Sequence, residues 1–163
     1  MFKKVQSVLR INQLGDLERL TPVSGGSINQ TFHAVCKRSE YFVKINKAFS
    51  VDAFIAEKHA LTCLPETKTI RVPSVKLVCK HENFAFSIMN FLSLKPLNAK
   101  AQALLGEKLA ELHKKKLSNR FGFDLNNTIG STPQINEWSD NWFDFFRTNR
   151  LGFQLKLAKK ALG

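Results

Sequence analysis

The spacing of apolar and polar residues changes along the chain, and its first part favours a β-rich fold. A short amphipathic helix is expected at residues 3–14, whose apolar positions are Val5, Leu9 and Leu14. From residue 17 onward apolar residues alternate with polar ones, which is typical of half-buried strands. The alternating stretches read LERLTPV at 17–23, NQTFHAVC at 29–36 and YFVKIN at 41–46. Short polar turns separate them, so we expect three consecutive antiparallel strands.

A helix and two more strands are expected next. Ser50 is a good helix N-cap, and Asp52 would lie in the first turn, where a carboxylate interacts favourably with the helix dipole. The helix would cover residues 51–64 and end at Pro65. Its apolar stripe consists of Phe54, Leu61 and Leu64. Two strand patterns follow, VPSVKLVCKHE at 72–82 and NFAFSIMNFL at 83–92.

After Pro96 the pattern becomes helical. Residues 99–116 place four apolar residues on one helix face, namely Ala101, Leu105, Leu109 and Leu112. An irregular stretch at 120–138 is rich in turn residues, and a final aromatic-rich helix at 139–162 would begin at a Ser139–Asp140 cap. The sequence therefore predicts a β-rich lobe at 1–95 and the beginning of an incomplete helical lobe at 96–163.

Composition narrows the class of protein. The chain has 25 Lys and Arg against 13 Asp and Glu, a net charge of +12 that suits anionic ligands. The densest basic run, His113–Arg120, lacks interleaved aromatic residues, so we read it as a solvated helix end and expect no nucleic-acid partner. No stretch approaches the roughly 20 apolar residues of a membrane span, and no secretory signal is present, so we expect a cytoplasmic protein without a membrane partner.

Cysteine and histidine indicate no metal or disulfide chemistry. Three cysteines without CxxC spacing argue against a disulfide framework or a zinc site, and we expect them to be reduced. Four histidines also show no metal-ligand spacing.

One constellation does point to chemistry. Gly25 and Gly26 lie between the first two predicted strands, Lys44 near the end of the third, and Glu57 in the helix that follows. A glycine pair there is most simply a hairpin turn, but a small-residue loop also lets backbone N–H groups approach phosphate oxygens. Kinases use a phosphate loop, a strand lysine and a helix glutamate in this order. The loop is neither a Walker A motif nor the G-x-G-x-x-G of protein kinases.

Several motifs carry a resemblance to a known family. They are PVSGGSIN, VKIN, TIRVP, LGEKLAELH, RLGFQLKLA and above all FGFDLNNTIGSTPQ followed by N-x-W. The sequence resembles the N-terminal part of the fructosamine kinase family, also called ketosamine kinases, over essentially its whole length. The resemblance implies an α+β, protein-kinase-like fold. A five-stranded antiparallel sheet with one helix packed on it would be followed by the first helices of a truncated helical lobe.

The resemblance also implies roles for individual residues. Lys44 matches the phosphate-binding lysine of the family and Glu57 its partner, in a site for ATP. The other nucleotide-binding positions implied are Gly25, Gly26, Ser27, Asn29, Met89, Asn90, Phe91 and Leu92. The family often has an acidic residue at the Asn90 position. A substrate-facing role is implied for Asn127, Thr128 and Gln134.

Family members transfer the γ-phosphate of ATP to the sugar of ketosamines such as fructosamines or ribulosamines, bound to protein or free as small molecules. The adduct then falls apart, which is protein deglycation. The catalytic base and the Asp that binds metal do not occur in these 163 residues, although Mg²⁺ is expected for the complete enzyme. Asp124, Asp140 and Asp144 do not match those motifs. We therefore expect the chain to be inactive on its own.

Two alternatives to a ketosamine kinase stay open at this point. The chain could be an inactive fragment or pseudo-enzyme that acts as an interaction module, or a basic nucleic-acid binder. The incomplete helical lobe would also expose apolar residues that drive self-association, namely Phe143, Phe146, Leu151, Phe153 and Leu155.

Overall fold

The computed structural model describes residues 1–24, 28–115 and 117–162. They form two compact units, Met1–Leu109 and Ala110–Gly163, and each unit is described by itself. The division lies inside a helix, α3 (Ala99–Lys114). The lobe boundary expected between residues 95 and 96 stays a prediction.

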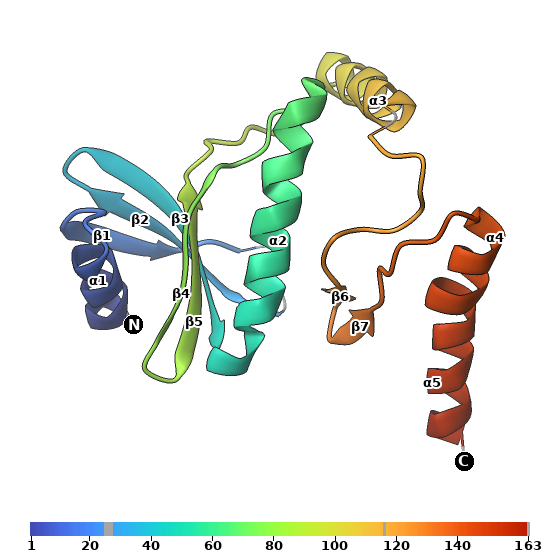
Figure 1. Cartoon of the computed structure of the whole chain (residues 1–163). Helices are drawn as coiled ribbons and strands as arrows, with labels where there is room; N and C mark the ends of the chain where they lie inside the picture. The colour runs from blue at the N-terminus through green and yellow to red at the C-terminus, as the bar shows by residue number, and fades with distance from the viewer. Residues whose placement is uncertain (25–27, 116, 163) are drawn as a thin grey trace. The chain divides into compact units, whose positions relative to one another are not determined.

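A five-stranded antiparallel sheet forms the first unit (Figure 1), as predicted. The strands lie in the order β1-β2-β3-β5-β4. They are β1 (Leu17–Pro22), β2 (Gln30–Cys36), β3 (Ser39–Lys47), β4 (Val75–His81) and β5 (Phe84–Asn90). The fourth strand begins at Val75, three residues later than the apolar pattern starts, and Pro73 lacks the N–H that a ladder needs.

The two faces of the sheet carry different helices (Figure 1). On one face, α1 (Phe2–Ile11) buries Val5, Val8 and Leu9 in the larger apolar core. On the other face, α2 (Val51–Cys63) packs Phe54 against the sheet in a smaller apolar cluster. Full burial of a phenylalanine side chain stabilises a fold by about 1.5–3 kcal/mol. The buried residues of each helix therefore hold it against its own face of the sheet.

The start and end of α2 differ in detail from the sequence prediction. A 3-10 turn, Ala48–Ser50, precedes the helix, and the Ser50 side chain makes no capping hydrogen bond. At the other end, Pro65 does not stop helical structure, because it begins a second 3-10 turn, Leu64–Thr67. Proline is tolerated there since the first N–H groups of a helical turn have no partner within it.

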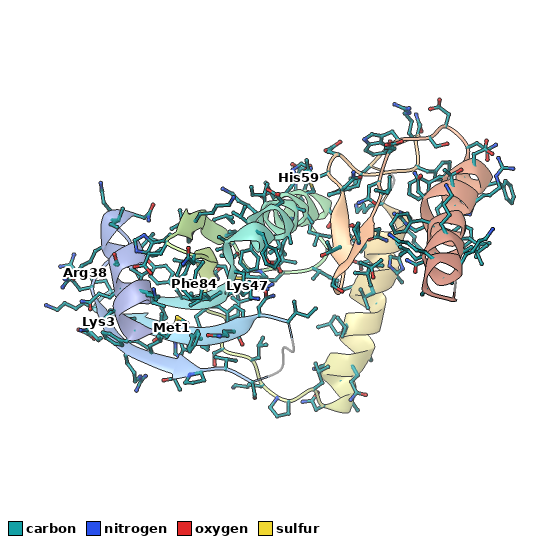
Figure 2. The ribbon with its side chains drawn as sticks, turned by 90° about the horizontal axis from the view of Figure 1, so that it is seen from below. Met1, Lys3, Arg38, Lys47, His59 and Phe84 are labelled. Carbon is teal, nitrogen blue, oxygen red and sulfur yellow. The ribbon has the colours of Figure 1, made fainter. Side chains whose placement is uncertain are left out.

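Strand β3 separates the apolar core from the polar face by simple alternation. Tyr41, Val43 and Ile45 belong to the larger core, so the residues between them face α2. Lys44 is one of these, and it pairs in register with Thr31 of β2 and Ser87 of β5. The register continues to the end of the strand, where Lys47 and Phe84 lie side by side (Figure 2).

Helix α3 exposes two of the four apolar residues that were predicted to share one face, while Ala101 and Leu112 are half-buried. None of its described residues is buried, and Leu105 and Leu109 are 41% and 38% exposed.

The second unit contains a short hairpin where the sequence predicted only an irregular stretch. Strands β6 (Asn127–Ile129) and β7 (Thr132–Gln134) pair antiparallel. Gly130 in the turn has φ +63°, a conformation that glycine adopts without the strain of a Cβ. Each strand has three residues, too few for an alternating pattern to show.

The last helical region corrects the predicted cap and the predicted single helix. The cap of α4 (Trp142–Phe145) is Asn141, whose side chain accepts bonds from two backbone N–H groups, rather than Ser139 or Asp140. The helix then continues through a π-helical segment, η3 (Phe146–Gly152), into α5 (Phe153–Leu162). Of the five residues expected to drive self-association, Phe143, Phe146, Leu151 and Leu155 are exposed, while self-association itself stays a prediction.

Gly122 is tightly enclosed, which gives a test of the second unit. A Cβ at Gly122 would lie 2.8 Å from the Trp138 Cα and 2.9 Å from the Asn136 carbonyl oxygen, and φ is +155°. We expect Gly122→Ala to lower the free energy of unfolding by about 1–3 kcal/mol, since backbone atoms must move. Both tryptophans of the chain, Trp138 and Trp142, lie in this unit, so urea denaturation followed by tryptophan fluorescence measures the effect.

Gly106→Ala in α3 is the matched control. A Cβ there would meet nothing within 4 Å. The substitution should leave the fluorescence transition unchanged and favour the helix by about 0.5–1 kcal/mol. Equal effects of the two substitutions would contradict the close packing described at Gly122.

Candidate functional site

A charge pair joins the sheet to α2 in the first unit. The Lys44 Nζ donates to the Glu57 Oε1 at 2.6 Å, and their side chains are 18% and 32% exposed. The structure thus brings together the two residues that the order of elements placed on facing surfaces. Removing either partner would leave the other charge partly desolvated and unpaired, which is costly.

The Lys44–Glu57 pair contacts an aromatic ring and still has hydrogen-bonding groups without a partner in the described part of the chain. The Phe54 ring centroid lies 5.7 Å from the Lys44 Nζ, close enough for a cation–π contact. The second carboxylate oxygen of Glu57, Oε2, is buried and has no hydrogen-bond partner among the described residues. An ammonium group carries three N–H donors, and Glu57 takes one of them. The pair therefore keeps both a donor surplus on the lysine and an acceptor on the glutamate.

The glycine turn cannot be judged directly, because Gly25, Gly26 and Ser27 lie outside the described residues. Its two flanks are closed by hydrogen bonds across β1 and β2. The Val23 N–H donates to the Thr31 carbonyl at 2.9 Å, and the Thr31 hydroxyl donates to the Val23 carbonyl at 2.6 Å.

Asn46 is a further residue of this site that the sequence analysis did not single out. Its Nδ2 donates to the Asn29 Oδ1 at 2.7 Å and to the Ile28 carbonyl at 3.2 Å. It lies two residues after Lys44 and so on the same face of β3. A polar residue at that spacing was the only sequence signal. Asn46 thereby fastens the end of the glycine turn to the strand that carries the lysine.

The residues at the end of β5 and just after it differ in their contacts. Met89 is 4% exposed and alternates with Ile88, a member of the larger core, so it lies on the Lys44 face. Asn90 instead binds Ser74, with its N–H donating to the Ser74 carbonyl at 3.1 Å and its Oδ1 accepting from the Ser74 N–H at 2.5 Å. The Phe91 N–H donates to the Glu40 carbonyl at 3.1 Å, and Leu92 is half-buried. The side chain at position 90 therefore helps to hold the backbone of Ser74 against β5.

The three predicted substrate residues lie on the hairpin of the second unit. Asn127 and Gln134 are register partners, and Thr128 pairs with Pro133. The Asn127 Oδ1 accepts from the Nδ2 of Asn136, a residue only 3% exposed, so Asn127 supports the hairpin. Gln134 lines a hollow of about 290 Å³ between the hairpin and the helical region.

Acidic residues of the second unit are held by arginines. Asp140 accepts from Arg120 and Asp144 from Arg147, each at 2.7 Å. Asp140 lies just before α4 rather than inside the predicted helix at 139–162, and both carboxylates are exposed. Within residues 1–24, 28–115 and 117–162, no group of three or more His, Cys, Asp or Glu side chains could hold a metal ion.

Cys36 and Cys79 are thiols outside any disulfide bond. Burial raises the pKa of the Cys36 thiol, with smaller contributions from Glu18 and Asp16, and burial raises the pKa of the Cys79 thiol. Raised values keep both thiols protonated at neutral pH, so neither is an activated nucleophile.

Comparison with known proteins decides the family. The family model described as fructosamine kinase matches residues 1–163. The chain belongs to the fructosamine kinase family. A protein-ribulosamine 3-kinase of Arabidopsis thaliana, described as chloroplastic, is 39% identical over 158 residues, covering 96% of this fructosamine kinase family chain and 48% of that protein.

Solved structures agree with the fold. A protein of Haemophilus somnus assigned as a fructosamine-3-kinase matches with a TM-score of 0.85 and 26% identity, covering 99% of this chain and 55% of that one. An aminoglycoside phosphotransferase, solved with ADP and hygromycin B, matches with a TM-score of 0.50 and 18% identity, covering 89% and 49%. These matches confirm the protein-kinase-like fold. The fructosamine kinase family chain spans about half the length of these relatives.

The described helices were also compared with the length and hydropathy of a membrane span. None of them is both long enough and apolar enough to cross a bilayer.

Asn46→Asp tests the anchor of the glycine turn. The substitution removes the Nδ2 donors and keeps the Oδ1 that accepts from the Lys47 N–H at 2.8 Å. Two hydrogen bonds contribute about 1–3 kcal/mol together, so amide hydrogen exchange at residues 28–31 should accelerate about tenfold. Asn12→Asp removes a comparable Nδ2 bond, to the Val8 carbonyl at 2.8 Å, and should leave exchange at 28–31 unchanged. Equal exchange in both variants would show that Asn46 does not hold the turn.

Proposed function

We propose that this chain forms the ATP-binding part of a ketosamine kinase, an enzyme that phosphorylates the sugar of ketosamines. The single observation that carries the proposal is the Lys44–Glu57 pair at 2.6 Å, in a chain that belongs to this family. The lysine is anchored on one side and has two further N–H donors available for phosphate oxygens. The relative named as a ribulosamine kinase supports the same class of reaction.

The pair is suited to holding a triphosphate. A lysine ammonium is a compact charge that interacts with phosphate without demanding bidentate geometry. Glu57 restricts the long Lys44 side chain, so less rotational freedom is lost when a nucleotide binds. Backbone N–H groups of a small-residue turn at 24–29 would complete the phosphate contacts, and Asn46 would hold Asn29 in place for them.

The nucleobase would meet the backbone after β5. The N–H groups of Asn90 and Phe91 already donate to Ser74 and Glu40, so a base would have to use carbonyl groups of this segment or the Leu92 N–H. Met89, on the Lys44 face, would supply apolar contact.

Phosphoryl transfer itself needs more than these residues. A sugar hydroxyl would attack the γ-phosphorus, forming a P–O bond to the sugar as the bond to the bridging oxygen of ADP breaks, and the hydroxyl proton would pass to a base. No base or Mg²⁺ ligand set is assigned to the described residues, so we assign no metal-dependent step to this chain. Mg²⁺ for the complete enzyme, substrate contact by Asn127, Thr128 and Gln134, and cytoplasmic location stay predictions.

Replacing the lysine tests the ATP site. Saturating ATP should raise the melting temperature of the unmodified chain, and Lys44→Ala should abolish that rise because the main cationic contact to the phosphates is lost. Lys47→Ala, on the same strand but exposed, is the control and should keep the rise. Equal ATP stabilisation of the Lys44→Ala variant would overturn the assignment. No ATP stabilisation in any form would favour the interaction module.

A second measurement tests how far the chain acts alone. ADP release with a ribulosamine-modified protein should stay at background for the 163-residue chain, because base and metal electrostatics supply most of the barrier lowering. The Arabidopsis relative is the positive control. Substrate-dependent ADP release that Lys44→Ala removes would show that this chain contains a complete catalytic site.

A further inference from the structure

An aromatic pair fastens the chain that leaves β5 to strand β2. The His33 ring stacks on the Phe91 ring, with centroids 3.7 Å apart and 13° between the planes. The His33 Nε2 also lies 2.8 Å from the Glu40 Oε2. Glu40 contributes again through its carbonyl oxygen, which accepts from the Phe91 N–H at 3.1 Å. Three contacts thus join β2, the start of β3 and the first residue after β5.

The place of this cluster on the sheet links it to the nucleotide site. His33 pairs in register with Phe42, and Thr31 pairs with Lys44, so both β2 residues lie on the Lys44 face. His33 is the middle residue of β2, which pairs with β1 on one side and β3 on the other, and its side chain is only 19% exposed. Phe91 begins the segment at 91–98 that leads to α3. The stack therefore fixes the direction of that segment at its first residue.

The geometry points to a role for His33 that rests on the proposed ATP site. We propose that His33 is a positioning residue, which holds Phe91 and so sets the backbone of 91–92 for contact with a purine base. The phosphate end of the site depends on Lys44 and Glu57 and does not include this cluster. A change at His33 should therefore affect ligands that carry a base and spare ligands that consist of phosphate alone.

Binding of ATP and of inorganic tripolyphosphate, measured by calorimetry on the 163-residue chain, separates the two ends. His33→Ala should weaken ATP binding about three- to tenfold, the effect of one lost aromatic contact, and leave tripolyphosphate binding unchanged. His33→Phe keeps a ring for the stack and should retain most of the ATP affinity. Lys44→Ala should weaken both ligands.

His81 provides the matched control. It makes an edge-on contact with Phe86 at the other end of the sheet, with ring centroids 6.5 Å apart. His81→Ala removes a histidine–phenylalanine contact of the same unit and should change neither affinity. Phe91→Leu removes the stack from the other side while keeping the backbone bond to Glu40, so it should reproduce the His33→Ala effect even if that variant folds poorly.

The outcomes distinguish this inference from the proposed function. Loss of both ligands on His33→Ala, or loss of neither, would overturn the positioning role while the ATP site stands. Tighter ATP binding by His33→Ala would also overturn it, because the ring pair would then occupy space that the base needs. If the unmodified chain bound tripolyphosphate but gained no affinity from the base of ATP, His33 would have nothing to position, and the proposal would fall.

Discussion

Everything assigned to this chain depends on one ammonium–carboxylate contact across the space between a sheet and a helix. Lys44 comes from β3 and Glu57 from α2, and neither side chain is fully buried or fully exposed. Such a pair adds little to the free energy of unfolding, since apolar residues of the same volume would stabilise the fold as well or better. Its value lies in fixing a cation at one point on the sheet. The apolar contacts of Phe54 and Val51 with the sheet hold the helix at the distance that this contact requires.

The sheet can hold this charge pair because its two faces differ in the amount of apolar packing. One face, covered by α1, is closed by a continuous apolar core. The other carries a smaller apolar cluster under α2 and a row of polar residues beside it, including Thr31, Lys44 and Asn46. The larger apolar core thus lies on the α1 side, and the polar groups of the proposed nucleotide site lie on the α2 side.

The sequence was informative wherever periodicity was strong. The five strands of the larger sheet and the helices α1, α2 and α3 were predicted because their apolar patterns persisted over six residues or more. It was uninformative where local bonding decides. The three-residue strands β6 and β7 are too short for a period to show, and the π-helical segment depends on hydrogen bonds that leave no mark in the apolar pattern. The cap at Asn141 was missed because Ser139 and Asp140 are equally good capping residues by type.

The candidate site divides in the same way. Lys44 and Glu57 could be placed because each lies on a predicted element. The hydrogen bond from Asn46 to Asn29 and the stacking of the His33 and Phe91 rings depend instead on strand register. Register follows from the whole sheet and cannot be read from one strand.

The alternation along β3 also restricts how this chain can vary in length. Because Lys44 lies between Val43 and Ile45, inserting or deleting a single residue within 41–46 would turn the ammonium into the core and an aliphatic side chain toward the ligand. Between the start of β2 and Lys44, a length change avoids this shift when it falls in the connection at 37–38, where the chain reverses between β2 and β3. Homologues should therefore differ in loop length there and keep a constant count of residues from that turn to the lysine.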